Sequence, residues 1–119
     1  MSTQLSQFYV HLLEKEEAAY PLAFYSFLFD TIQQTSLAEK AAAGIENKPF
    51  HLSPEKICSL FSQRARQVFG RFGSLVMDEW GVHSSRDVGE AVFKLAEYKC
   101  LTLSGSETLQ DFERAGLDV

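Results

Sequence analysis

The feature that most constrains the fold is a helix, a tight corner and a second helix between residues 72 and 96. Gly81 directly follows Trp80, at a position where a residue with positive φ ends a helix. Ser84 and Asp87 then have the spacing of a capping box, which predicts the start of the next helix. Gly89 lies inside that helix at a cost of up to about 1 kcal/mol relative to alanine, which indicates that another backbone presses close. The first helix has one apolar face at i, i+3, i+4 and i+8, with Trp80 as its core anchor: Phe72, Leu75, Val76 and Trp80.

Helix–corner–helix arrangements also occur in DNA-binding proteins. The charge of the second helix argues against that use, because a helix that reads a DNA groove carries a clear basic excess. Here Asp87, Glu90 and Glu97 balance Arg86, Lys94 and Lys99. We therefore expect nucleic acid to be an unlikely partner, and keep a winged-helix-like regulator as an alternative. It would pair residues 50–52 with residues 101–103 as a minor two-stranded β element.

Several short motifs occur together with this corner. Phe69-Gly70, Trp80-Gly81-Val82 and the block from Asp87 to Phe93 follow one another, with a later Asp111-Phe112. In this order the chain resembles a small family of uncharacterised bacterial proteins with Phe-Gly, Trp-Gly-Ile, Asp-x-Gly-Glu-Ile-Val-Phe-x-Leu and a later Asp-Phe. The resemblance covers about residues 20–112 and leaves residues 1–19 outside. The chain differs from the family pattern at Ala91 and at Lys99-Cys100. The family has no assigned activity, so the resemblance implies a fold and no function.

Length and composition fit a single globular domain. A chain of 119 residues buries about two-thirds of its unfolded surface, so it needs no disulfide or metal for stability. The net charge of -5 disfavours general affinity for nucleic acid or for anionic membranes. We find no secretory signal and no apolar run long enough to span a membrane. Cys58 and Cys100 are therefore expected to be reduced, buried thiols of a cytoplasmic protein.

The N-terminal part contains two apolar helical segments. Residues 4–17 form an amphipathic stripe, and residues 22–34 are apolar on most sides. A domain of this size has limited interior, so aromatic side chains left at its surface would mark an interface. Core packing against the remaining helices is the alternative. We expect self-association or protein binding here, with the following candidate interface residues: Leu5, Phe8, Tyr9, Leu12, Leu13, Phe24 and Phe27.

Residues 35–49 are predicted to be a loop-rich connector that includes at most a turn or two of helix. Ser53-Pro54 then predicts a helix start, because serine caps a helix and proline suits its first position. Arg64, Arg66 and Arg71 form the only cluster of like positive charge. They are candidates for contact with an acidic partner or a phosphate, and a solvated helix face is the alternative.

The C-terminal part allows two interpretations. Residues 101–103 alternate like a short strand, and after a turn the chain could return as a second strand or form a helix. We favour a helix capped by Ser106 and ended by Ala115-Gly116. The whole chain is thus predicted to be an all-α, single-domain bundle of five or six helices.

Catalytic and metal-binding patterns are sparse. His11 and Glu14 have the reversed order of the Glu-x-x-His pair of bundle metal sites, and no second copy exists. No phosphate-binding or nucleophile motif occurs. We therefore predict no metal, no cofactor and no catalytic residue, and expect a small module that binds another protein or itself. An enzyme would need a cleft that brings histidine, cysteine and carboxylate groups together.

Overall fold

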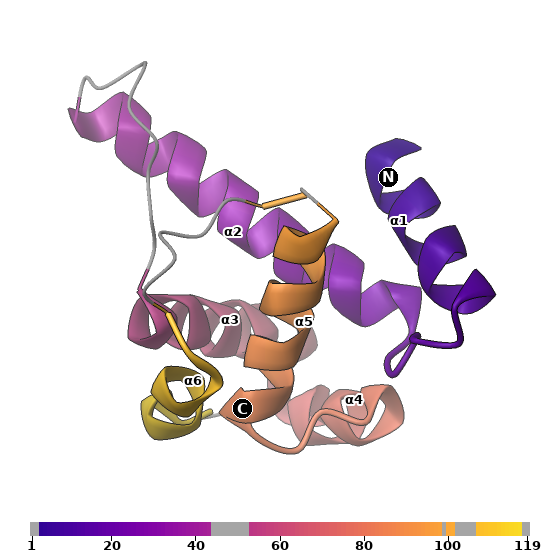
Figure 1. The fold of residues 1–119 in the computed structure, drawn as a ribbon. Coiled ribbons are helices and arrows are strands. Elements are labelled where there is room, and N and C mark those ends of the chain that lie inside the picture. The colour runs from indigo at the N-terminus through magenta and orange to yellow at the C-terminus, as the bar shows by residue number, and fades with distance from the viewer. Residues whose placement is uncertain (1–2, 44–52, 99, 102–106, 118–119) are drawn as a thin grey trace.

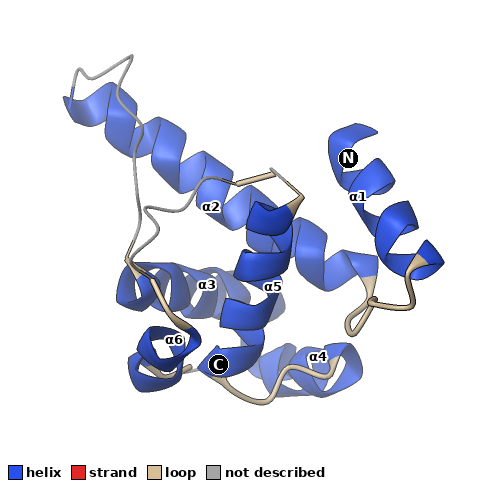
Figure 2. Ribbon diagram, viewed as in Figure 1, coloured by secondary structure: helices blue, strands red, loops and turns tan. Residues whose placement is uncertain are grey.

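The computed structural model describes residues 3–43, 53–98, 100–101 and 107–117 (Figure 1). These residues form helices and connecting turns, without a strand among them (Figure 2). The all-α bundle of five or six helices is thus confirmed, whereas the two-stranded element falls largely outside the described residues. The elements are α1 (Thr3–Glu14), α2 (Leu22–Ala43), α3 (Pro54–Phe69), the 3-10 turn η1 (Gly70–Phe72), α4 (Gly73–Trp80), α5 (Ser85–Glu97) and α6 (Leu109–Ala115).

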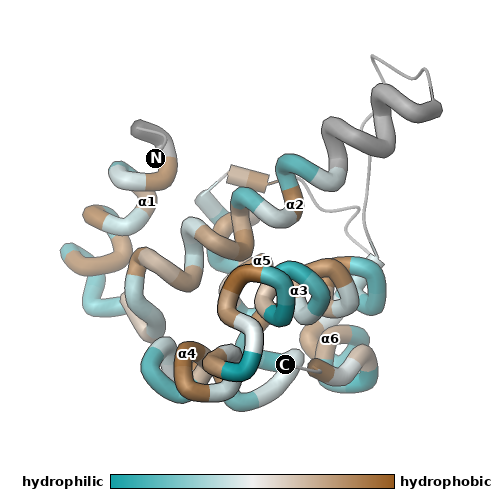
Figure 3. Tube along the Cα trace, turned by 180° about the vertical axis from the view of Figure 1, so that it is seen from behind, coloured by the Kyte–Doolittle hydropathy of each residue, from teal (hydrophilic) through white to brown (hydrophobic). Residues whose placement is uncertain are grey.

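Helix α5 lies at the centre of the bundle, with α6, α3 and α2 packed against it (Figure 1). Helix α1 alternates hydrophobic and hydrophilic residues (Figure 3) and turns its apolar side inward. Its Phe8 ring meets the ring of Tyr25 in α2 edge-on, with 5.2 Å between centroids, and the ring of Tyr98 after α5 at 5.4 Å. Residues 1–19, which have no counterpart in the resembled family, therefore contribute a helix that closes one side of the core.

Local signals start and end most helices where the sequence predicts. Ser53 caps α3 by accepting a hydrogen bond from the Lys56 amide at 3.2 Å. Gly81 ends α4 with φ +75°, the left-handed conformation expected of it. Gly116 follows α6 with φ +79°. The start of α6 differs from the prediction, since Thr108 is its cap instead of Ser106, and the helix begins at Leu109.

The predicted connector at 35–49 is wrong in its first half. Helix α2 continues without a break through Ala43, as one element of 22 residues (Figure 1). The reason is local: residues 37–43 read Leu-Ala-Glu-Lys-Ala-Ala-Ala, which are all strong helix formers, and no glycine or proline interrupts them before Gly44. The linker residues 44–49 lie outside the described part.

As its position inside α5 predicts, Gly89 lies in close contact with another part of the chain. The contact is with a side chain, that of Phe112, and not with the predicted backbone. A Cβ at this position would lie 2.6 Å from Cγ and 2.7 Å from Cβ of Phe112. Phe112 is fully buried, and its ring packs edge-on against Phe93 of α5. The absence of a side chain at residue 89 therefore allows α6 to dock on α5.

Candidate functional site

Most of the predicted N-terminal interface lies inside the chain. Leu5, Phe8, Leu12 and Phe24 are at most 2% exposed, so the prediction that they face a partner is wrong. The physical reason is that α2 and the end of α5 cover the apolar stripe of α1, which is the core-packing alternative. Tyr9 and Phe27 are half-buried against the core.

Only Leu13 of that predicted set stays well exposed, at 54%, beside Val10 at 52%. The exposed apolar surface of α1 therefore consists of these two side chains and is too small for the predicted interface.

The three arginines do not form one site. Arg64 is half-buried, donates to Thr31 Oγ1 at 2.9 Å and lies over the Phe27 ring at 4.8 Å, so it ties α3 to α2. Arg66 is two positions further along α3, which turns it to the other side of the helix, where it lines a depression shared with the end of α6. Arg71 lies in η1 over the ring of Phe72, at 5.1 Å. A shared phosphate site built from all three is therefore not formed.

Asp87 performs its predicted capping role at the start of α5. Its Oδ2 accepts hydrogen bonds from the Ser84 amide at 3.0 Å and from the His83 amide at 2.8 Å. Its Oδ1 accepts from the Tyr20 hydroxyl at 2.7 Å. Burial opposes ionisation of this carboxyl, but these hydrogen bonds outweigh it and lower the pKa of Asp87.

Tyr20 is the residue of this network that sequence reasoning missed. It is 8% exposed, and its hydroxyl lies 2.7 Å from Asp87 and 3.0 Å from Glu90 Oε2. Burial, together with the two carboxylates, raises the pKa of Tyr20 far above its usual value. The sequence gives Tyr20-Pro21 only as the end of one pattern and the start of the next helix. Nothing local predicts a contact 67 residues away.

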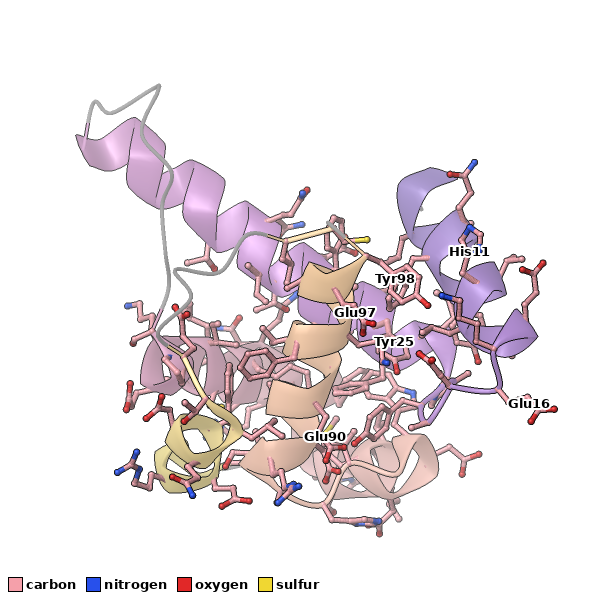
Figure 4. All side chains as sticks on the ribbon, viewed as in Figure 1. His11, Glu16, Tyr25, Glu90, Glu97 and Tyr98 are labelled. Atoms are coloured by element: carbon pink, nitrogen blue, oxygen red, sulfur yellow. The ribbon has the colours of Figure 1, made fainter. Side chains whose placement is uncertain are left out.

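A pocket of about 300 Å³ opens beside this network, between α5 and the segment that joins α1 to α2. Lys94 lies in its wall, bound to Glu17 at 2.8 Å and to Glu97 at 3.2 Å. Tyr25 of α2 reaches the same pocket between Glu90 and Glu97 of α5 (Figure 4). The sequence carries no signal for this convergence, because its residues come from three separate segments.

A second feature is apolar. Val68, Phe72 and Leu75, which we call the corner patch, are 57%, 54% and 62% exposed, across the junction of α3, η1 and α4. Phe72 and Leu75 share a predicted helical face with Val76 and Trp80, yet only Val76 and Trp80 pack against the core. The Trp80 ring contacts Phe24, Phe27 and Phe69.

Gly70 explains this difference, because its φ of +56° ends α3 and the chain re-enters a helix through a 3-10 turn. In α4 the buried residues are Gly73 and Met77, so the inward face is offset from Leu75. The predicted face is therefore split between core and solvent.

The candidate catalytic and metal-binding groups stay apart. His11 and Glu14 form an exposed pair at 3.7 Å. Within the described ranges, no three histidine, cysteine or acidic residues converge in a way that could hold a metal ion. Burial raises the pKa of Cys58 to about 11, which keeps it a neutral thiol, the opposite of an activated nucleophile. Cys100 is likewise free and buried.

Comparison with protein-family models, with curated proteins and with solved structures finds no match for this chain. The resemblance to the Trp-Gly and Gly-Glu family therefore stays an expectation. Within the described part of the chain, no helix combines the length and the apolar character that crossing a membrane requires.

Proposed function

We propose that this protein is a self-associating module, which binds a second copy of itself through the corner patch. The observation that carries the proposal is the exposure of three large apolar side chains within eight residues, in a chain that buries most others of that kind. These side chains gather at one helical corner, and a large exposed apolar patch usually marks an interaction site. Both cysteines are free thiols, which supports a reducing, cytoplasmic environment for the module.

The charges around the patch favour a second copy over an unrelated partner. Arg71 lies four residues before Leu75, and Glu79 lies four residues after it. Both are exposed, and neither forms an ion pair with another described residue. If two copies meet in antiparallel fashion about a two-fold axis at Leu75, Arg71 of each copy faces Glu79 of the other. A two-fold interface requires this kind of self-complementarity.

The size of the patch sets the expected strength. Three apolar side chains from each copy and two exposed ion pairs per dimer make a small interface, below the roughly 1,200 Å² of stable complexes. Exposed ion pairs add at most about 1 kcal/mol each and chiefly fix the orientation. We therefore expect a reversible dimer that dissociates on dilution.

Sedimentation velocity over a concentration series tests the proposal. The wild-type chain should move from monomer towards dimer between about 10 µM and about 1 mM, the regime of small transient interfaces. Leu75→Glu should remain a monomer throughout, because it places a charge at the centre of the patch.

Leu13→Glu is the matched control, since Leu13 is a leucine of similar exposure on α1, and it should dimerise like the wild type. A monomeric wild-type chain at the highest concentration would refute the proposal. A dimer that is lost with Leu13→Glu and kept with Leu75→Glu would move the interface to α1.

A further inference from the structure

The pocket beside α5 has more negative than positive charge in and around its walls. Glu17, Glu90 and Glu97 contribute carboxylates, and Asp87 approaches the same Tyr20 hydroxyl as Glu90. On the positive side, Lys94 binds Glu17 and Glu97, and Arg86 binds Glu90 at 3.2 Å. Lys15 also acts on Glu17, and Arg86 is shared with Glu113 at 2.6 Å, so these four carboxylates are met by three cations, one of them shared with a fifth carboxylate.

The Tyr20 hydroxyl does not remove this excess. It has one proton and so can fully donate to only one of the two carboxylates that it contacts. The second carboxylate keeps unused acceptor capacity on the pocket side of α5. Glu90 and Glu97 also keep side chains that are 41% and 62% exposed, so a ligand can reach them.

Tyr25 supplies an independent sign of a ligand. The residue is only 1% exposed, yet its side chain lines the pocket. The aromatic contacts of its ring are with Phe8, Tyr9, Tyr20 and Phe24, while its hydroxyl forms no hydrogen bond within the described part of the chain. Unlike the fully enclosed Tyr98 hydroxyl, the Tyr25 hydroxyl is open to the pocket, where its oxygen can accept a hydrogen bond from a ligand.

We propose that this pocket binds a small organic ammonium ion, with the Tyr25 hydroxyl oxygen and the Glu90 and Glu97 carboxylates as acceptors. Phe93 and Leu109 in the same wall give an apolar surface for the carbon chain. The volume of about 300 Å³ lies at the lower limit of ligand pockets, so the ligand is small. An anion is disfavoured, because Lys94, the one cation in the wall, already holds two carboxylates.

Butylammonium is a suitable probe, and butan-1-ol and butyrate are its neutral and anionic counterparts of similar length. Each is titrated into the full-length ¹⁵N-labelled chain, and the amide shifts of residues 90–97 are followed by NMR. Butylammonium should give saturable shifts that weaken with added salt, and the other two should give none. Equal shifts with butan-1-ol would overturn the proposal, since they would show an apolar cleft without charge selectivity.

Two phenylalanine variants locate the site. Tyr25→Phe removes only the unpartnered hydroxyl and should weaken butylammonium binding about tenfold, the effect of losing a hydrogen bond to a charged group. Tyr98→Phe is the matched control, because it also removes a tyrosine hydroxyl without a described partner, but one that is enclosed and belongs to a residue that does not line the pocket. It should bind like the wild type. Unchanged affinity in Tyr25→Phe would overturn the proposal.

The ammonium group could belong to a free amine or to a lysine side chain of a peptide. Nα-acetyl-lysine-N-methylamide separates these sources. Saturable binding at least as tight as that of butylammonium assigns the pocket to a lysine side chain, whereas its exclusion assigns the pocket to a free amine.

Discussion

The contact between Gly89 and Phe112 predicts that Gly89→Ala lowers the free energy of unfolding, whereas the same substitution in most helices raises it. In an ordinary exposed helix, glycine to alanine stabilises by up to about 1 kcal/mol, because alanine loses less backbone entropy on folding. Here the new Cβ would lie 2.6 Å from Phe112 Cγ, 2.7 Å from Cβ and 2.9 Å from Cδ2. A rotamer change of Phe112 can move the ring atoms Cγ and Cδ2 but leaves Cβ in place, so it cannot clear the contact at 2.7 Å. Gly89→Ala should therefore destabilise the protein.

The magnitude follows from two opposing effects. Overpacking a closed core site costs about 1–3 kcal/mol, and displacing α6 from α5 costs more. All three contacts are shorter than 3.0 Å, so the upper part of this range, about 2–3 kcal/mol, applies, and subtracting a propensity gain of about 1 kcal/mol leaves a net loss of about 1–2 kcal/mol. For a domain of this length such a loss lowers the melting temperature by about 4–8 °C. Differential scanning calorimetry and urea denaturation of Gly89→Ala measure it directly.

The control for this prediction is a double-mutant cycle with Phe112→Ala. Two of the three close contacts are to ring atoms, so the cost of Gly89→Ala should fall in the Phe112→Ala background. A melting temperature of Gly89→Ala at or above that of the wild type would refute the packing explanation. Equal costs in the two backgrounds would show that the effect of residue 89 does not pass through the Phe112 ring, because alanine at position 112 keeps the Cβ contact.

Three further predictions concern stability. Asp87→Asn should cost about 1 kcal/mol through the weakened cap at the start of α5, as measured by thermal melts. The folded-state pKa of Asp87 is lowered, so its contribution is full above the unfolded pKa of about 3.9 and is lost as pH falls through the folded value. Acid titration of unfolding should therefore be shallower in Asp87→Asn. Arg64→Ala should cost about 1–2 kcal/mol in urea denaturation through the lost tie to Thr31 and Phe27, whereas Arg71→Ala should change stability by less than about 0.5 kcal/mol.

Local signals in the sequence were sufficient for much of the fold. The Ser53-Pro54 start, the positive φ of Gly81 and the Asp87 cap depend on a few neighbouring residues, and each occurs as predicted. Gly89 indicates a close approach because glycine inside a helix is costly. These features need no knowledge of how the helices are arranged.

The sites could not be predicted in the same way, because they depend on which helix covers which face. The stripe of α1 has the same periodicity whether α2 or a second chain buries it, so sequence alone left both alternatives open. The Tyr20 contact with Asp87 joins residues 67 positions apart. The exposure of Phe72 and Leu75 follows from the turn at Gly70, whose φ of +56° separates the inward face of α4 from the face that periodicity predicts.

A charge-exchange experiment tests the central claim, self-association through the corner patch, most directly. In the proposed antiparallel pair, Arg71→Glu alone places two glutamates against each other at both charge contacts, and Glu79→Arg alone places two arginines against each other there. Each variant should therefore be monomeric in sedimentation velocity at concentrations where the wild type dimerises. An equimolar mixture should form a heterodimer, because both of its charge pairs then attract. A mixture that stays monomeric beside a dimeric wild type, or single variants that dimerise as well as the wild type, would contradict this account.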